Sequence, residues 1–182
     1  MNIHQQLLLV DDHDTFSGQY ADRLSCHTGK GLHHRAFVVV VFNDKKEILL
    51  QKRKHVLWDK FWDVTAISHV LHLSDHDETY EEAAQRSLHE EMGIPEIPLK
   101  NTGGFNYFAE YKDNYCENEY CSILIGKWNG IVKPNTNAVY EYTWMSLENF
   151  YADVKENEKK YAPWAILTAK FLMKNQSLRS FA

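Results

Sequence analysis

Three histidines and two glutamates stand where they could bind one metal ion. His27 and His34 precede a strongly apolar segment, and His69 follows another short apolar segment. Glu117 and Glu119 open a segment of strand character, so alternation places both carboxylates on one face, where they repel unless a positive charge lies between them. Three imidazoles and two carboxylates suit Zn²⁺, Mn²⁺ or Fe²⁺, and Mg²⁺ less readily. Taken singly, each histidine is better explained as a surface residue or a satisfied core residue.

A second charged group lies on the clearest predicted helix, residues 79–92. Thr79 and Glu82 have capping-box spacing at its start, and Gly93 followed by Pro95 ends it.

The carboxylates at this helix offer a second metal chemistry. Glu78, Glu90 and Glu91 could together hold a hard cation such as Mg²⁺. The alternative is a solvated helix face on which Arg86 pairs with Glu82 and Glu90. Glu91 suits that alternative less well, because it falls beside the apolar stripe of the helix, where a carboxylate needs a partner such as a cation.

Aromatic side chains could line a pocket for an organic ligand, and the alternative is core packing, which is the better explanation for Phe61. These residues are Trp58, Phe61, Trp62, Tyr107 and Trp164.

Hydrophobic patterns supply the elements that would position these residues. Strands are predicted at residues 7–10, 36–42, 47–51, 61–67, 105–111, 117–128 and 140–145, and late helices at residues 147–156 and 164–174. Strands mixed with one central helix and two late helices predict an α/β (α+β) sandwich.

Composition narrows the class of protein. The 182 residues are 44% hydrophobic and carry a net charge of −5, so we expect one domain with its own core and no basic patch for nucleic acid. Three cysteines, an odd number with no CxxC pair, argue against a disulfide scaffold. The longest apolar run, residues 36–42, is too short for a membrane span, and the N-terminus lacks signal-peptide character. We therefore expect a cytoplasmic protein.

The predicted helix and the residues before it resemble the Nudix box. Seven positions match the pattern of that box: Glu78, Arg86, Leu88, Glu90, Glu91, Gly93 and Ile94. His72 stands in place of the leading glycine, and Ser87 in place of the glutamate after the arginine. The resemblance implies a single Nudix domain over residues 1–182, with mixed β-sheets sandwiched between helices.

From Leu7 to about Phe171 the chain resembles type 1 isopentenyl-diphosphate isomerases, a branch of the Nudix superfamily. The resemblance implies a metal site at His27, His34, His69, Glu117 and Glu119, with Glu91 holding Mg²⁺ on a diphosphate. It implies catalytic roles for Glu119 and Tyr107, a Trp164 ring that faces the substrate cation, and phosphate contacts from Arg23, Arg53 and Arg86.

The main departure from that family is Ile67. The family's catalytic cysteine lies two residues before the third histidine, and here Ile67 occupies that place in the substrate-binding wall. In the family, two groups on opposite faces of a five-carbon alkene add and remove a proton, and an isoleucine can do neither. Among the cysteines, only Cys121 shares the inward face with Glu119, so it is the one reserve.

Three functions remain open. The first is isomerase-like chemistry, a 1,3-allylic proton shift on an isoprenoid diphosphate, without the cysteine. The second is a Nudix hydrolase that cleaves a nucleoside or prenyl diphosphate, with Glu78, Glu90 and Glu91 around Mg²⁺. The third is a non-catalytic, metal-stabilised diphosphate-binding module. In each case we expect a divalent metal (Zn, Mn or Mg) at the His/Glu site, Mg with the diphosphate, a small-molecule diphosphate partner, neither nucleic acid nor membrane, and a monomer or homodimer.

Overall fold

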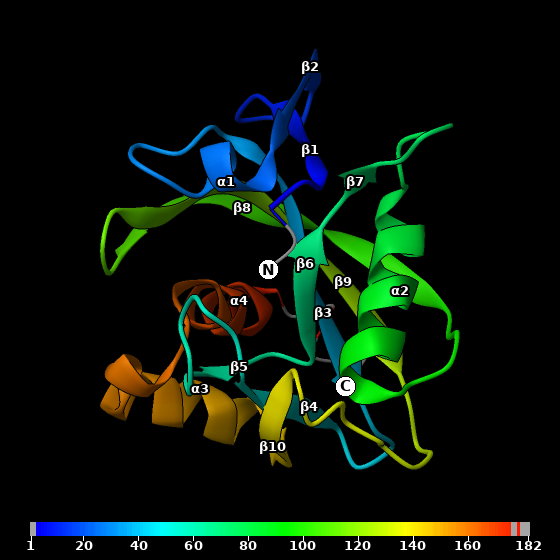
Figure 1. Ribbon diagram of the computed structural model, residues 1–182. Coiled ribbons are helices and arrows are strands. Elements are labelled where there is room, and N and C mark those ends of the chain that lie inside the picture. The colour runs from blue at the N-terminus through cyan, green and yellow to red at the C-terminus, as the bar shows by residue number, and fades with distance from the viewer. Residues whose placement is uncertain (1–2, 176–177, 179–182) are drawn as a thin grey trace.

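The computed structural model describes residues 3–175 and 178 and places a mixed β-sheet at the centre (Figure 1). Strand β3 (His34–Phe42) forms its middle, and residues 36–42 are fully buried, as the apolar run predicts. β3 pairs in parallel with β9 (Tyr115–Lys127) and antiparallel with β6 (Ala66–His69). The sheet continues from β9 to β8 (Leu99–Tyr111), and at the far end of β3 through β4 (Glu47–Arg53) to β10 (Val139–Ser146).

A smaller group of strands extends one end of this sheet. β1 (Gln6–Val10) pairs with β2 (Phe16–Asp22) and with β7 (Leu71–His72). The short helix α1 (Arg23–Cys26) follows β2 directly, capped by the Asp22 carboxylate.

Helices cover both faces of the sheet. α2 (Tyr80–Met92) packs on one face, and α4 (Pro163–Lys174), beside α3 (Leu147–Glu156), packs on the other, with a 3-10 turn at Glu158–Lys160 between them (Figure 1). Each face has its own apolar core. The predicted arrangement of mixed sheet between helices is confirmed. Among the described residues, no helix has the length and apolar character needed to cross a membrane.

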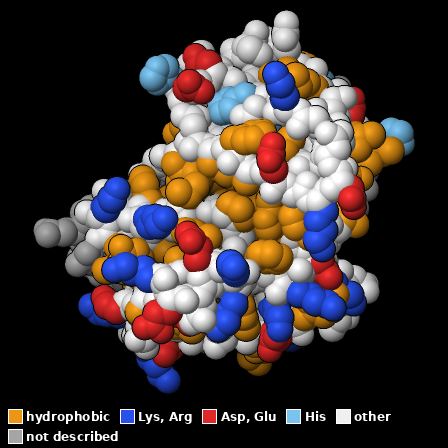
Figure 2. All heavy atoms as spheres, turned by 90° about the vertical axis from the view of Figure 1, so that its left-hand side faces the viewer, with side chains coloured by type: hydrophobic (Ala, Val, Ile, Leu, Met, Phe, Trp, Pro, Cys, Tyr) orange, Lys and Arg blue, Asp and Glu red, His pale blue; other side chains and the backbone are white. Residues whose placement is uncertain are grey.

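One face of the molecule shows how charge and apolar surface are distributed (Figure 2). Hydrophobic side chains gather across its hollowed middle, whereas Lys, Arg, Asp and Glu side chains of both signs crowd the part below.

The structure corrects one of the expected strands. The predicted strand at residues 61–67 is two short strands, β5 (Trp62–Asp63) and β6. Between them the Thr65 hydroxyl donates to the Leu49 carbonyl and accepts from the Val41 amide, so it bridges β4 and β3 where these strands separate.

Of the two ion pairs considered as an alternative for Arg86 on α2, with Glu82 and with Glu90, only the pair with Glu90 is present among the described residues. The capping box of Thr79 and Glu82 is present, which occupies the Glu82 carboxylate. Arg86 instead makes two hydrogen bonds to Glu78, and its nearest approach to Glu90 is 3.8 Å.

Candidate metal centre and its pocket

Strand register brings the predicted metal-binding side chains together. His34 on β3 lies opposite Glu119 on β9, and Glu119 lies opposite Tyr107 on β8. His69 on β6 lies opposite Ala36, one row further along the same face. His27 follows α1, and its carbonyl accepts from the Cys116 amide, which ties it to the start of β9.

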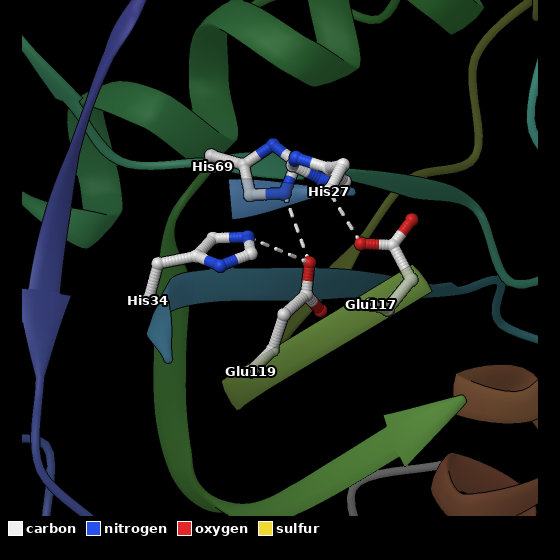
Figure 3. A group of neighbouring side chains, drawn as sticks. All are labelled: His27, His34, His69, Glu117 and Glu119. Carbon is white, nitrogen blue, oxygen red and sulfur yellow. Dashed lines mark hydrogen bonds and ion pairs between the residues drawn. The ribbon is translucent and has the colours of Figure 1, made fainter. Parts of the chain in front are cut away.

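The five side chains converge on one point (Figure 3). One ligand atom from each of His27, His34, His69, Glu117 and Glu119 lies within 4.8 Å of all the others. The three imidazole rings are 4.8 to 4.9 Å apart, centre to centre. The Nε2 atoms of His27 and His69 are each 2.9 Å from a carboxylate oxygen, of Glu117 and Glu119 respectively.

The orientation of two imidazoles fits cation binding. Nδ1 of His27 and Nδ1 of His34 lie 2.6 Å and 2.7 Å from the Arg23 and Leu32 carbonyls, so each Nδ1 carries a hydrogen. In the neutral ring, Nε2 then presents a lone pair toward the carboxylates. Lone pairs of nitrogen and carboxylate oxygen face each other stably only when a proton or a cation lies between them.

Because these glutamates and histidines are buried close together, their pKa values are shifted. Burial and the Glu119 charge raise the pKa of Glu117 to about 7. Burial lowers the pKa of His34, and burial together with Arg23 holds the pKa of His69 well below its usual range. Burial opposes ionisation of Glu119, but the imidazoles of His34 and His69 hold its pKa well below the usual range. Burial likewise opposes protonation of His27, whose pKa is nevertheless raised by Glu117.

Buried polar atoms that make no hydrogen bond test whether a metal ion fits these residues. Nε2 of His34 and Oε2 of Glu117 are buried and lie 3.3 Å from Glu119 Oε1 and 2.9 Å from His27 Nε2, but neither atom makes a hydrogen bond of acceptable geometry within the described part of the chain. Such atoms are costly unless something else binds them. A buried N₃O₂ donor set with unsatisfied atoms aimed inward therefore suits a divalent transition metal, and Mg²⁺ less well.

Tyr107 adds a proton donor to this centre. Its hydroxyl donates to Glu119 Oε2 at 2.5 Å, whereas Glu119 Oε1 faces the histidines. Burial and the Glu119 charge raise the pKa of Tyr107 well above its usual range, so the phenol remains protonated.

A cavity of about 290 Å³ adjoins the metal centre. Its apolar wall comprises Leu57, Ile67, Ala138 and Trp164. Its cationic side chains are Arg23, Arg53, Lys54 and Arg86. Basic groups beside an apolar wall suit an anionic ligand with a hydrocarbon part.

Comparison with known proteins places this arrangement in a family. The NUDIX domain pattern matches residues 32–165. The chain is 31% identical over 174 residues to the isopentenyl-diphosphate Delta-isomerase of Haloarcula marismortui, covering 90% of this chain and 88% of that protein. It is 34% identical over 160 residues to isopentenyl-diphosphate Delta-isomerase 2 of Photorhabdus laumondii, covering 87% and 86% of the two chains.

The chain belongs to the Nudix family, in its isopentenyl-diphosphate isomerase-like branch.

Two solved structures share the fold. A Deinococcus radiodurans protein aligns with a TM-score of 0.68 at 15% identity, covering 91% of this chain and 98% of that one. The MutT protein of Methanosarcina mazei aligns with a TM-score of 0.60 at 19% identity, covering 78% and 94%.

The three predicted phosphate-binding arginines differ in this Nudix pocket. Arg53 pairs with the buried Asp63 at 2.9 Å, and Arg86 pairs through two nitrogens with Glu78. Arg23 is only 9% exposed, its Nε has no hydrogen-bond partner, and no ion pair to its guanidinium is seen among residues 3–175 and 178. Arg23 is therefore the buried pocket cation whose charge is least compensated.

The Nudix-box carboxylates do not gather at one point. Glu78 accepts from Arg86 and from the Leu71 amide, and the Glu90 side chain is 63% exposed. Glu91 lines the pocket, outside the five-residue metal centre, and accepts one hydrogen bond at each oxygen, from Ser87 and Gln51.

Ile67 lies two residues before His69 on β6, which places it on the same face as the metal centre. It is half-buried in the pocket wall opposite Val38 of β3.

Cys121 lies on β9, on the other side of β3 from Ile67, and burial raises its pKa well above the usual range. Cys121 is thus separated from the Ile67 position by a strand and stays a thiol.

Several residues of this region were missed by the sequence interpretation, and two of them are titratable groups with shifted pKa values, His55 and Asp63. His55 lines the pocket, and burial together with Arg53 lowers its pKa to about 3, so it is neutral. Asp63 lies directly behind the wall and contacts both Arg53 and Trp164. An acid within an apolar strand pattern is the signal that could have identified Asp63.

Proposed function

We propose that this protein binds an isoprenoid diphosphate together with a divalent metal and moves a proton at the alkene of that ligand. The observation that carries the proposal is the convergence of three histidines and two glutamates on one point, with Tyr107 bonded to Glu119 beside a cationic cavity. The isoprenoid part of the proposal is supported by the names of the relatives.

In this proposal His27, His34, His69, Glu117 and Glu119 hold the metal, which when bound offsets the negative charge of the two glutamates. Glu119 then exchanges a proton with the alkene through Oε2, the oxygen that Tyr107 orients. The Trp164 ring stabilises the developing tertiary cation. Glu91 would help to hold a second cation, Mg²⁺, since each Glu91 oxygen keeps a lone pair beyond its single hydrogen bond, and that cation would offset the charge of the diphosphate.

Ile67 limits the second half of this reaction. After protonation, a neighbouring carbon must lose a proton, and Ile67 offers no base there. Removal of that proton therefore falls to Glu119 itself or to water, which makes net isomerisation slow.

The geometry favours proton transfer over hydrolysis. A Nudix hydrolase of the kind considered above would need Glu78, Glu90 and Glu91 around one Mg²⁺. Here Glu78 is neutralised by Arg86, and Glu90 lines the pocket with a side chain that is 63% exposed.

Incubation of metal-loaded protein with isopentenyl diphosphate in D₂O tests the proposal. Deuterium entering the ligand, with or without dimethylallyl diphosphate, is expected, and Glu119→Gln should abolish it. Release of phosphate or pyrophosphate would instead indicate hydrolysis. Saturable binding with neither result would indicate a binding module, and no binding would contradict all three functions.

Arg23 should dominate binding of the diphosphate. Arg23→Gln is expected to weaken binding of pyrophosphate at least tenfold, since a hydrogen bond to a charged group contributes about 1.5–3 kcal/mol. Arg53→Gln should have a smaller effect, because Asp63 already compensates that charge. Isothermal titration with pyrophosphate measures both, with Lys52→Gln, which pairs with Glu141 outside the pocket, as control. Equal losses for Arg23 and Arg53 would contradict the ranking.

A further inference from the structure

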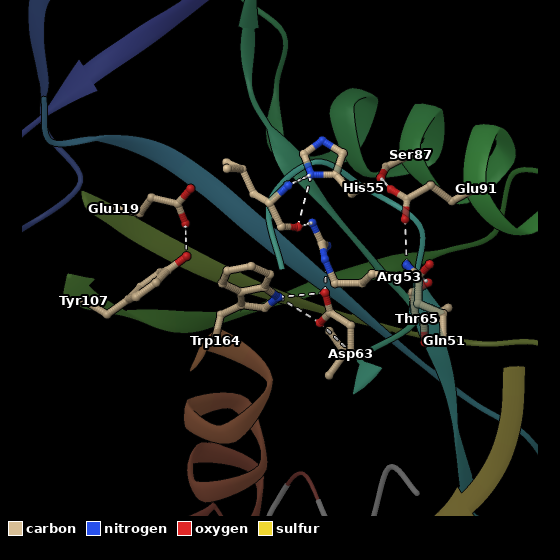
Figure 4. A network of polar contacts seen from close by, with 12 residues as sticks. Gln51, Arg53, His55, Asp63, Thr65, Ser87, Glu91, Tyr107, Glu119 and Trp164 are labelled. Atoms are coloured by element: carbon tan, nitrogen blue, oxygen red, sulfur yellow. Dashed lines mark hydrogen bonds and ion pairs between the residues drawn. The ribbon is translucent and has the colours of Figure 1, made fainter. Parts of the chain in front are cut away.

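Asp63 is a fully buried carboxylate next to the pocket (Figure 4). Both of its oxygens lie 2.8 Å from Trp164 Nε1, Oδ2 accepts from Arg53 Nη1 at 2.9 Å, and Oδ1 accepts from the Val64 amide at 2.7 Å. Each of these neighbours is a donor, so the arrangement suits the ionised carboxylate.

Arg53 and Trp164 also contact each other. The Arg53 guanidinium carbon lies 4.9 Å from the centre of the Trp164 ring, a cation–π distance. Trp164 is further packed against Trp58 at 5.0 Å and Tyr107 at 6.2 Å between ring centres. One carboxylate therefore fixes both a cation of the pocket and the aromatic ring of its apolar wall.

Stability alone does not require an acid at this position. Buried ion pairs are often no more stabilising than apolar residues of similar volume, because removing two charges from water is costly. An apolar side chain could fill the space of Asp63 but could neither orient the indole N–H nor compensate Arg53.

We propose that Asp63 is a positioning residue, which orients the Trp164 ring for the hydrocarbon part of the ligand and restrains Arg53 from binding the diphosphate. The proposal rests on the function proposed above. It predicts effects of opposite sign on the two halves of the ligand, whereas general damage to the fold would weaken both.

Two substitutions separate these roles. Asp63→Asn keeps an acceptor for the indole but removes the charge, so the buried Arg53 loses its counter-ion and should bind an added anion. Titration with magnesium pyrophosphate should show binding about three- to tenfold tighter than in the wild type, on the scale of one nearby charge. Asp63→Leu should bind pyrophosphate more tightly as well, but it should lose the extra affinity that isopentenyl diphosphate has over pyrophosphate.

An indole NMR signal reports the ring directly. In protein labelled with ¹⁵N-tryptophan, the Trp164 Nε1–H peak, assigned with Trp164→Phe, should keep its hydrogen-bonded position in Asp63→Asn and move in Asp63→Leu. The matched control is Asp14→Asn, since Asp14 likewise binds an arginine, Arg35, and an aromatic residue, Tyr80, away from the pocket. Asp14→Asn should change neither readout.

Weaker or unchanged pyrophosphate binding in Asp63→Asn would overturn the proposal, as would an unmoved indole peak in Asp63→Leu. If the wild type binds neither ligand, the proposed function fails instead, and with it the role of Asp63 that depends on it.

Discussion

Replacement of Ile67 by cysteine is expected to raise the conversion of isopentenyl to dimethylallyl diphosphate by about 10²- to 10⁴-fold, the usual contribution of one general acid or base. Ile67 is half-buried in the pocket wall, on the face of the sheet that carries Glu119. A thiol there would supply the proton transfer that the isoleucine cannot. The measurement is the initial rate of product formation by metal-loaded protein, followed by NMR.

The control for this gain is Ile67→Ala, which enlarges the pocket without adding a titratable group. If alanine raised the rate as much as cysteine, the limit would be space and not proton transfer. If both variants and the wild type were inert and took up no deuterium, isomerase chemistry would be excluded.

Loss of the metal is the second large expected effect. The purified protein should contain about one tightly bound divalent ion per chain, and His34→Ala should lower its affinity at least a hundredfold, because even outer-shell changes cost about 10- to 100-fold. A metal at 100 times its dissociation constant stabilises the fold by about 2.7 kcal/mol, so chelation should lower the melting temperature measurably. Elemental analysis and thermal unfolding provide the two readouts.

His72→Ala is the matched control, since His72 also contacts a carboxylate, Asp77 at 2.7 Å, but on the surface. It should leave metal content and chelator response unchanged. A wild-type protein without bound metal, and with the same melting temperature before and after chelation, would contradict the assignment of the five residues.

The fold was predictable where local pattern and tertiary structure agree. The apolar run at residues 36–42 lies within the central strand, the capping box starts α2, and α3 spans Leu147–Glu156 as expected. The strand β2 was not predicted, because most of its side chains are exposed and it lacks an apolar pattern. The two-residue strand β7 and the four-residue helix α1 were also missed, since elements this short are stabilised by neighbours distant in sequence, as β7 is by β1.

The sequence predicted which residues belong to the candidate site, but not which charged side chains form ion pairs there. Residue type and resemblance identified the five side chains that the structure groups together, although their function as metal ligands stays a proposal. Sequence spacing could not show that Glu78 and Asp63 compensate Arg86 and Arg53 while Arg23 has no ion-pair partner in the described part of the chain. That difference arises from side-chain geometry between separate elements.

The strand register that places His34, Glu119 and Tyr107 side by side also limits where residues can be inserted into or deleted from the chain. Inserting or deleting one residue just after Glu119 in β9 would turn both glutamates toward the opposite face of the sheet, and could do so with the rest of the β3–β9 pairing intact. Changes in chain length should therefore be accommodated in loops such as residues 73–77, and a protein engineer seeking a new activity on this scaffold would alter those loops and leave the spacing of β9 untouched.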